Sequence, residues 1–288
     1  MPQLAVTHVT TYDYSKDVEL GPHRMMLRPR ESPHLHLVEH ELHVEPTADV
    51  EWSQDVSGNA VAEATFGQPT RRLRIASRAV IDLEAPRWPV FPIAASAASY
   101  PFLYSAEDWT DLGALAGPQY ADPTGRLAGW AGAFVMAHPT DTLSLLKDLA
   151  EGVAMETVYR SREVEGTQGP LETLDLGSGS CRDLAVLFAE AARTLGFGAR
   201  LVSGYLHDPR RQLTGSTGEG STHAWVEIYL PGAGWITFDP TNRALGSADL
   251  VPVAVGRRME QISPVIGHFY GPRDASSEMR IEVNIKGQ

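Results

Sequence analysis

Cysteine is almost absent from this sequence, which has a single thiol, that of Cys181, in 288 residues. One cysteine cannot form a disulfide within its own chain, so the count favours a reducing compartment. It also leaves one free thiol whose role has to be explained.

Basic residues are scarce relative to acidic ones. The chain has 24 Lys and Arg against 36 Asp and Glu, a formal charge of −12, which disfavours nonspecific binding to nucleic acid or anionic lipid. Long apolar runs are lacking too: the longest, 130–137, is too short to span a bilayer, and the first residues do not resemble a signal peptide. We therefore expect a cytoplasmic protein that binds neither nucleic acid nor membranes.

Repeats and low-complexity segments are also absent, and the glycine-rich residues 177–180 lack the Lys-Ser/Thr pair of a P-loop. We therefore expect no nucleotide and no other cofactor. What is present is a globular composition, 43% hydrophobic and 21% charged, over a length sufficient for two domains.

The patterning changes along the chain and predicts an α+β fold. Residues 1–105 have the alternation of strands in an N-terminal, β-rich, sandwich-like domain that ends in a proline-rich linker at 84–101. Residues 106–288 begin with helical patterns, clearest after an N-cap at Thr140, and continue with another helix and several strands. The predicted strands are 4–10, 34–44, 61–66, 72–83, 201–206, 223–230, 234–238 and 279–285.

Cys181 lies at the predicted start of a helix that Gly196 ends. At this position the unpaired N–H groups and the positive end of the helix dipole favour a thiolate over a thiol. The apolar face of the helix should pack on a sheet and fix the sulfur in place. The alternative is that Cys181 is simply a small buried residue.

A histidine and an aspartate follow on adjacent predicted strands. His223 begins one strand and Asp239 ends the next, and a thiol nucleophile requires such a pair as its base and orienting group. Strand parity puts both on one face only if the connection has an odd length or the hairpin contains a bulge, for example with Tyr229 opposite Trp235. We also predict a long, exposed, mobile loop from 206 to 222 beside this site.

The segments at 179–183, 196–205, 223–227 and 235–241 together resemble the core of the transglutaminase-like superfamily, a papain-like cysteine fold. The N-terminal segments 8–14, 27–30 and 55–59 look like the β-rich domain that precedes this core in bacterial members. The resemblance implies a catalytic triad of Cys181, His223 and Asp239, with Tyr159 as a candidate oxyanion donor or an ordinary core residue. One departure lies at 256–258, where the third position is Arg258 and not an acidic residue.

The resemblance implies acyl transfer from a peptide or protein amide through a thioester. We favour a peptidase or amidase, because nothing resembles a calcium site; a glutamine transglutaminase or deamidase is the alternative. A non-enzymatic peptide-binding module with a vestigial site is the rival interpretation. Four histidines lie close together in the sequence: His34, His36, His40 and His43. The alternating pattern of a partly buried strand already accounts for this segment, so no metal site is expected.

Overall fold

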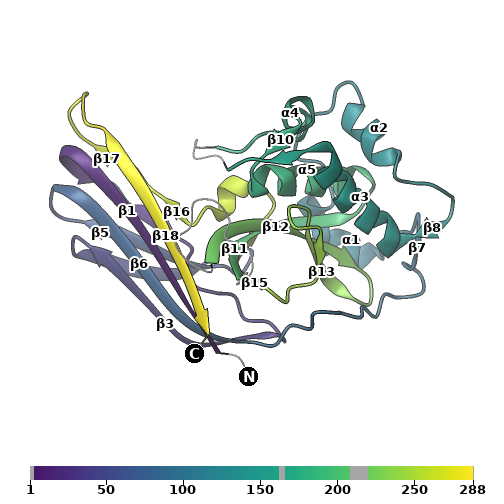
Figure 1. The fold of residues 1–288 in the computed structure, drawn as a ribbon, viewed down its shortest axis with the longest axis horizontal. Coiled ribbons are helices and arrows are strands. Elements are labelled where there is room, and N and C mark those ends of the chain that lie inside the picture. Colours follow the sequence, from purple (N-terminus) through teal and green to yellow (C-terminus); the bar gives the residue numbers. More distant parts are fainter. Residues whose placement is uncertain (1–2, 162–165, 208–219, 288) are drawn as a thin grey trace.

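The computed structural model describes residues 3–161, 166–207 and 220–287. A β-sandwich occupies one side of the molecule, and helices packed around a further sheet occupy the other (Figure 1). The expected α+β class, with a β-rich N-terminal part and a helix packed on an antiparallel sheet, is confirmed.

Two antiparallel sheets form the sandwich, and apolar side chains fill the space between them. Val18, Met25, Ala62, Leu73 and Ile75 are all almost fully buried there. The first sheet runs β18–β1–β6–β3, with the short β17 also on β1, and the second runs β16–β2–β5–β4. Their bounds are β1 Gln3–Leu20, β2 His23–Met25, β3 Leu35–Glu45, β4 Ala48–Gln54, β5 Ala60–Phe66, β6 Thr70–Leu83, β16 Val265–Ile266, β17 Phe269–Tyr270 and β18 Ser277–Gly287.

The position of β18 corrects a prediction. The sequence pattern assigns strand 279–285 to the second domain, but β18 pairs antiparallel with β1, from Leu4 opposite Gly287 to Tyr14 opposite Ser277. Alternation defines which face of a strand is buried and carries no information on its neighbour, so the partner was not predictable from it. The stretch 106–288 is therefore not one unit, because its last strand completes the N-terminal sheet.

The second part is built on an antiparallel sheet ordered β14–β13–β12–β11–β15. Helix α5 (Cys181–Thr194) packs on β11 and β12, and Phe188 of α5 meets Phe238 of β13 with ring centroids 5.4 Å apart. The strands are β11 Gly198–His207, β12 Gly220–Leu230, β13 Gly234–Asp239, β14 Ala244–Leu245 and β15 Leu250–Gly256.

Further helices and short strands complete the second part. The helices are α1 Ala106–Leu112, η1 Gly113–Leu115, α2 Arg126–Gly132, α3 Thr142–Glu156, α4 Pro170–Leu176 and η2 Met259–Ile262. Two pairs of two-residue strands accompany them: β7 Ser99–Tyr100 pairs with β8 Thr140–Asp141, and β9 Val158–Tyr159 pairs with β10 Ser178–Gly179. The predicted N-cap of α3 is one residue early: Asp141 accepts the Ser144 N–H at 2.7 Å, whereas Thr140 pairs in β8. None of the helices in the described residues is long and apolar enough to cross a membrane.

The predicted loop at 206–222 is shorter than expected at both ends. Leu206 and His207 pair with Ser221 and Gly220, which extends the β11–β12 ladder. The glycine, serine and threonine residues of this segment predict a loop, so they did not reveal that pairing. The middle of the segment, 208–219, lies outside the described residues.

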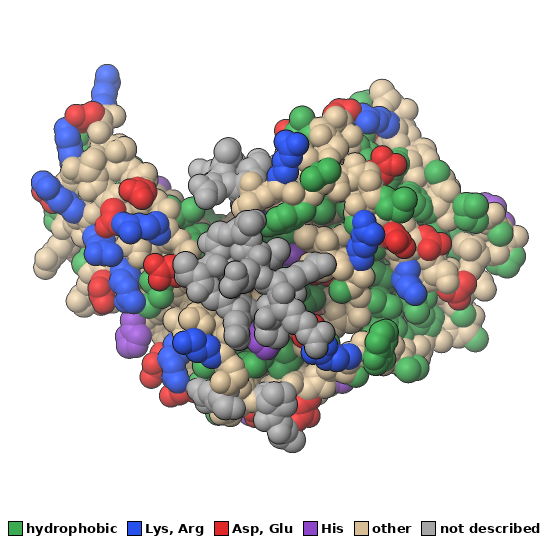
Figure 2. All heavy atoms as spheres, viewed as in Figure 1, with side chains coloured by type: hydrophobic (Ala, Val, Ile, Leu, Met, Phe, Trp, Pro, Cys, Tyr) green, Lys and Arg blue, Asp and Glu red, His purple; other side chains and the backbone are tan. Residues whose placement is uncertain are grey.

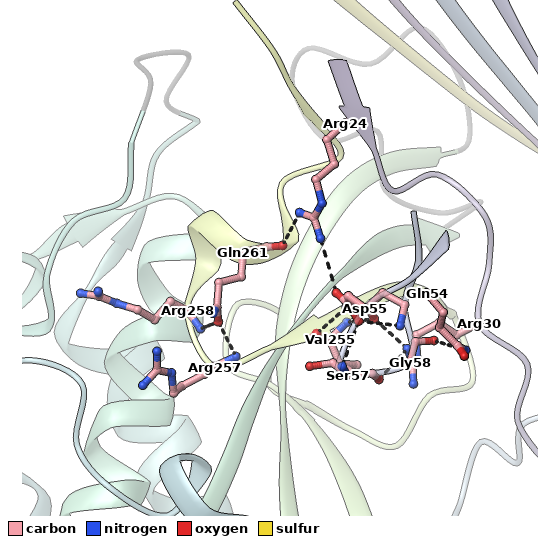
Figure 3. A network of polar contacts seen from close by, with 11 residues as sticks. Arg24, Arg30, Gln54, Asp55, Ser57, Gly58, Val255, Arg257, Arg258 and Gln261 are labelled. Atoms are coloured by element: carbon pink, nitrogen blue, oxygen red, sulfur yellow. Dashed lines mark hydrogen bonds and ion pairs between the residues drawn. The ribbon is translucent and has the colours of Figure 1, made fainter. Parts of the chain in front are cut away.

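Polar contacts join the sandwich to the second part (Figure 3). The buried side chain of Asn59 donates to the Val255 carbonyl and accepts the Val255 N–H, both at 2.8 Å, so it acts as a one-residue strand partner for β15. Arg24 donates to the Gln261 carbonyl at 3.2 Å and contacts Asp55 at 3.5 Å. These bonds hold the turn at 55–59 against the edge of the core sheet.

Charges of both signs are interspersed over the sandwich side of the face in Figure 2. Asp13 of β1, for example, contacts Arg72 of β6 at 3.4 Å and Arg280 of β18 at 2.7 Å. Exposed pairs of this kind add little to stability, but charges on an edge strand discourage it from pairing with another chain.

Candidate active site

Cys181 is the first residue of α5, as the sequence predicts, and its side chain is partly buried. The helix starts there because Asp183, fully buried, accepts the Ser180 N–H at 2.8 Å and the Ser180 hydroxyl at 2.7 Å. Asp183 also accepts the Gln168 N–H at 2.8 Å, which ties the segment before α4 to the cysteine. The Cys181 N–H is a first-turn donor without an acceptor inside the helix.

His223 and Asp239 lie on one face of the β12–β13 hairpin. Tyr229 is opposite Trp235 and Val226 is opposite Phe238, the register predicted from strand parity. The connection has three residues, an odd length, and Gly232 within it has a φ of +84°. A side chain at position 232 would also collide with the Pro92 carbonyl, at 2.6 Å, so glycine is required there.

The His223 Nε2 atom lies 2.7 Å from Asp239 Oδ2, and both side chains are almost fully buried. A carboxylate oxygen can only accept, so Nε2 carries the proton and donates it. Nδ1 is then the ring nitrogen available to Cys181, with which His223 makes a further side-chain hydrogen bond.

The site stabilises a charged imidazole. Burial alone would lower the pKa of His223, but the Asp239 carboxylate and the contact with Cys181 outweigh it and raise the pKa from 6.5 to about 10. Burial likewise acts to raise the pKa of Asp239, but the His223 charge and hydrogen bonds from His223 and Asn242 hold it below its ordinary 3.8. The pair is therefore an imidazolium and a carboxylate at neutral pH.

Tyr159 lies in β9, opposite Gly179 of β10, and so beside the start of α5. Its side chain is partly exposed, at 37% for the residue. Burial raises the pKa of its hydroxyl, and the nearby Cys181 adds to that effect. The structure thus places this predicted oxyanion donor next to the predicted nucleophile.

Two polar residues at the site were not singled out from the sequence. Asp183 follows Ser180 at the spacing of a helix-capping pair, a pattern that was available in the sequence. Asn242 donates from Nδ2 to Asp239 Oδ2 at 2.7 Å, and it belongs to a four-residue turn whose geometry no periodicity specifies.

The histidines of the N-terminal part do not converge. His40 contacts the Ser77 hydroxyl at 3.0 Å, and His36 contacts Glu31 at 2.8 Å. Buried His8 lies between Tyr205 and Thr10, and burial lowers its pKa to about 4. Across the residues that the structure describes, no group of three or more His, Cys, Asp or Glu side chains is arranged to hold a metal ion.

Comparison with known proteins agrees with this architecture. Residues 4–82 match the model of the bacterial transglutaminase-like N-terminal region, and residues 130–240 match that of the transglutaminase-like superfamily. A crystal structure of a candidate cysteine protease from Cytophaga hutchinsonii superposes with a TM-score of 0.77 at 19% identity, covering 99% of this chain and 90% of that one. The fold is therefore transglutaminase-like.

One relative in sequence extends over nearly the whole chain, and another over less than half of it. An uncharacterized protein of Mycobacterium tuberculosis is 31% identical over 279 residues, which cover 92% of this chain and 87% of the relative. One from Mycobacterium leprae is 33% identical over 124 residues, 42% of this chain and 44% of that protein. This chain belongs to the transglutaminase-like superfamily, in the bacterial form that carries the transglutaminase-like N-terminal region.

Proposed function

We propose that this protein is a thiol-dependent acyl-transfer enzyme that hydrolyses amides of peptides or proteins. Cys181 is the nucleophile, His223 the acid and base, and Asp239 the residue that orients His223. The observation that carries the proposal is the arrangement around His223, whose Nε2 is held by Asp239 at 2.7 Å while the ring also contacts Cys181.

In the acylation step, the Cys181 thiolate attacks the carbonyl carbon of the amide and a C–S bond forms. The Cys181 N–H and the Tyr159 hydroxyl donate hydrogen bonds to the carbonyl oxygen and stabilise the negative charge that develops there. The His223 imidazolium then gives a proton to the amide nitrogen, the C–N bond breaks, and an amine or ammonia leaves a thioester on Cys181.

Deacylation reverses the role of His223. The neutral imidazole takes a proton from water, the water oxygen attacks the thioester carbon, and the C–S bond breaks to release a carboxylic acid and the thiolate. An amine in place of water gives transfer, and attack on a glutamine side chain followed by water gives deamidation. All three outcomes share the first step and the same residues.

A mixed peptide library tests the proposal directly. We expect new termini or deamidated glutamines, detected by mass spectrometry, with the wild-type protein and none with Cys181→Ala. Addition of a primary amine separates hydrolysis from transfer, because only transfer incorporates the amine. Products that persist with Cys181→Ala would overturn the assignment of the nucleophile.

The rival, a peptide-binding module with an inert thiol, predicts a different alkylation behaviour. A thiolate paired with the His223 imidazolium should react with iodoacetamide well below pH 7, whereas an inert thiol reacts only near or above its ordinary pKa of about 8.5. Mass spectrometry of Cys181 after timed alkylation at pH 5.5, 7 and 9 distinguishes the two.

A further inference from the structure

The Asp239 carboxylate receives more donors than the proposed triad uses. On Oδ2, His223 Nε2 and Asn242 Nδ2 each lie at 2.7 Å. On Oδ1, the Thr241 N–H donates at 3.0 Å and the Asn242 N–H at 3.2 Å. Four donors match the four acceptor positions of a carboxylate, so Asp239 has no freedom to rotate without losing hydrogen bonds.

We infer that Asn242 is a positioning residue for this site, which fixes the Asp239 carboxylate so that Oδ2 faces the His223 ring. The inference rests on the proposed function, because it assigns a role within the proposed triad. Asn242 makes two of the four bonds to Asp239, one from its backbone and one from its side chain.

The orientation of the Asn242 amide follows from its neighbours. An amide oxygen 2.7 Å from a carboxylate oxygen would be repelled, so the atom there is the donor Nδ2. Nδ2 also lies 3.3 Å from His223 Nε2, and both nitrogens therefore donate to the same oxygen. The Asn242 side chain thus shares the acceptor that orients the histidine.

A second donor on Oδ2 has a chemical consequence as well. Hydrogen bonds to a carboxylate favour its ionised form and reduce its affinity for a proton. Asn242 therefore opposes transfer of the Nε2 proton from His223 to Asp239. The imidazolium keeps both protons, and the Nδ1 proton remains available for the leaving group of the substrate.

The turn between β13 and β14 explains how Asn242 reaches this position. Asp239 pairs with Ala244 across four intervening residues, and Arg243 among them has a φ of +53°, the left-handed region. The bonds from the Thr241 and Asn242 N–H groups to Oδ1 fold the chain over the carboxylate directly after Asp239, and the left-handed Arg243 then leads the chain into β14.

Asn242→Leu tests the inference, because leucine has a similar size and no donor. Two measurements need no substrate: the low-field proton resonance of the His223–Asp239 hydrogen bond, and the pH profile of iodoacetamide alkylation of Cys181. We expect the resonance to broaden or disappear and the alkylation rate at pH 6 to fall by about tenfold. Asn242→Gln, which keeps an amide donor, should recover part of both.

Asn284→Leu is the matched control, since Asn284 is exposed on β18, and it should behave as the wild type. A wild-type resonance and a wild-type alkylation profile in Asn242→Leu would overturn the inference. So would a lower melting temperature with an unchanged profile, because a purely structural role predicts that combination. Failure of the proposed function is a separate outcome, seen as an absence of Cys181-dependent products in the peptide library.

Discussion

At the scale of single residues, the site depends on three side chains that the fold brings together from α5, β12 and β13. The helix start places the Cys181 sulfur, and the hairpin register places His223 and Asp239 on one face. The backbone of α5 fixes the position of residue 181, so a change of this side chain alone should be well tolerated by the fold.

Cys181→Ala should therefore remove activity and leave the structure intact. The change deletes one sulfur at a partly buried helix start, which creates little cavity, and we expect a change in the free energy of unfolding of no more than about 1 kcal/mol. Urea unfolding and peptide-library turnover measure the two quantities. Full activity without the thiol would remove the basis for the triad.

The pH dependence of the free energy of unfolding follows from the shifted pKa values of His223 and Asp239. Folding raises the pKa of His223 from 6.5 to about 10. The contribution of His223 to the stability of the fold is therefore complete below pH 6.5 and is lost as the pH rises through 10. The pKa of Asp239 is lowered from 3.8, so its stabilisation is complete above that value and is lost as the pH falls through the lowered one. Both contributions are complete between pH 3.8 and 6.5.

Asp239→Asn measures this coupling. The difference in the free energy of unfolding between wild type and variant should be largest between pH 4 and 6.5 and should shrink toward pH 10. The alkaline fall in activity should move to lower pH, and the rate should drop by about a hundredfold, less than with Cys181→Ala. A pH-independent difference in stability would contradict the coupling.

At the scale of elements, close packing beneath the site sets a strict requirement at Gly204. This residue lies opposite His223 on β11, and an added Cβ would lie 2.1 Å from the Val251 carbonyl and 2.7 Å from the ring of Trp225. We expect Gly204→Ala to destabilise the fold by about 2 kcal/mol or more, because the collision involves backbone.

Gly67→Ala is the matched control for Gly204→Ala. An added Cβ at Gly67 meets nothing within 4 Å, so this variant should stay within about 0.5 kcal/mol of the wild type. Thermal and urea unfolding of the two variants provide the comparison. Equal stability of both would mean that β11 and β15 adjust more freely than their packing implies.

The same elements show how far the sequence predicts the structure. Helix α5 and the β12–β13 register were predictable, because an amphipathic period and the face shared by His223 and Asp239 allow few alternatives. Strand β4 was missed although Ala48, Val50 and Trp52 alternate with polar residues, so this pattern was available in the sequence. Asn242 was missed because its contact with Asp239 depends on turn dihedral angles and not on a period.

At the scale of the whole molecule, the sandwich supports the edge of the core sheet. Asn59 satisfies both backbone groups of Val255 and also accepts from Arg30 at 2.7 Å. Asn59→Ala should lower the free energy of unfolding by about 2 to 4 kcal/mol, because it leaves buried partners without hydrogen bonds.

Hydrogen exchange of β15 should also accelerate in Asn59→Ala, since the Val255 amide loses its acceptor. Asn284→Ala, at an exposed site on β18, serves as the control and should change neither the unfolding curve nor the exchange rates. Unchanged exchange at Val255 in Asn59→Ala would show that the two parts are held by other contacts.

The pairing of β18 with β1 has a consequence for the order in which the protein is made. β1 leaves the ribosome first of the described strands and β18 last, and synthesis at about 5–20 residues per second separates them by tens of seconds. During that interval β1 has β6 on one side and an open edge on the other, a template for unwanted association. Among the described strands, β18 thus covers the open edge of β1, and the nascent chain should be most prone to associate through that edge before β18 leaves the ribosome.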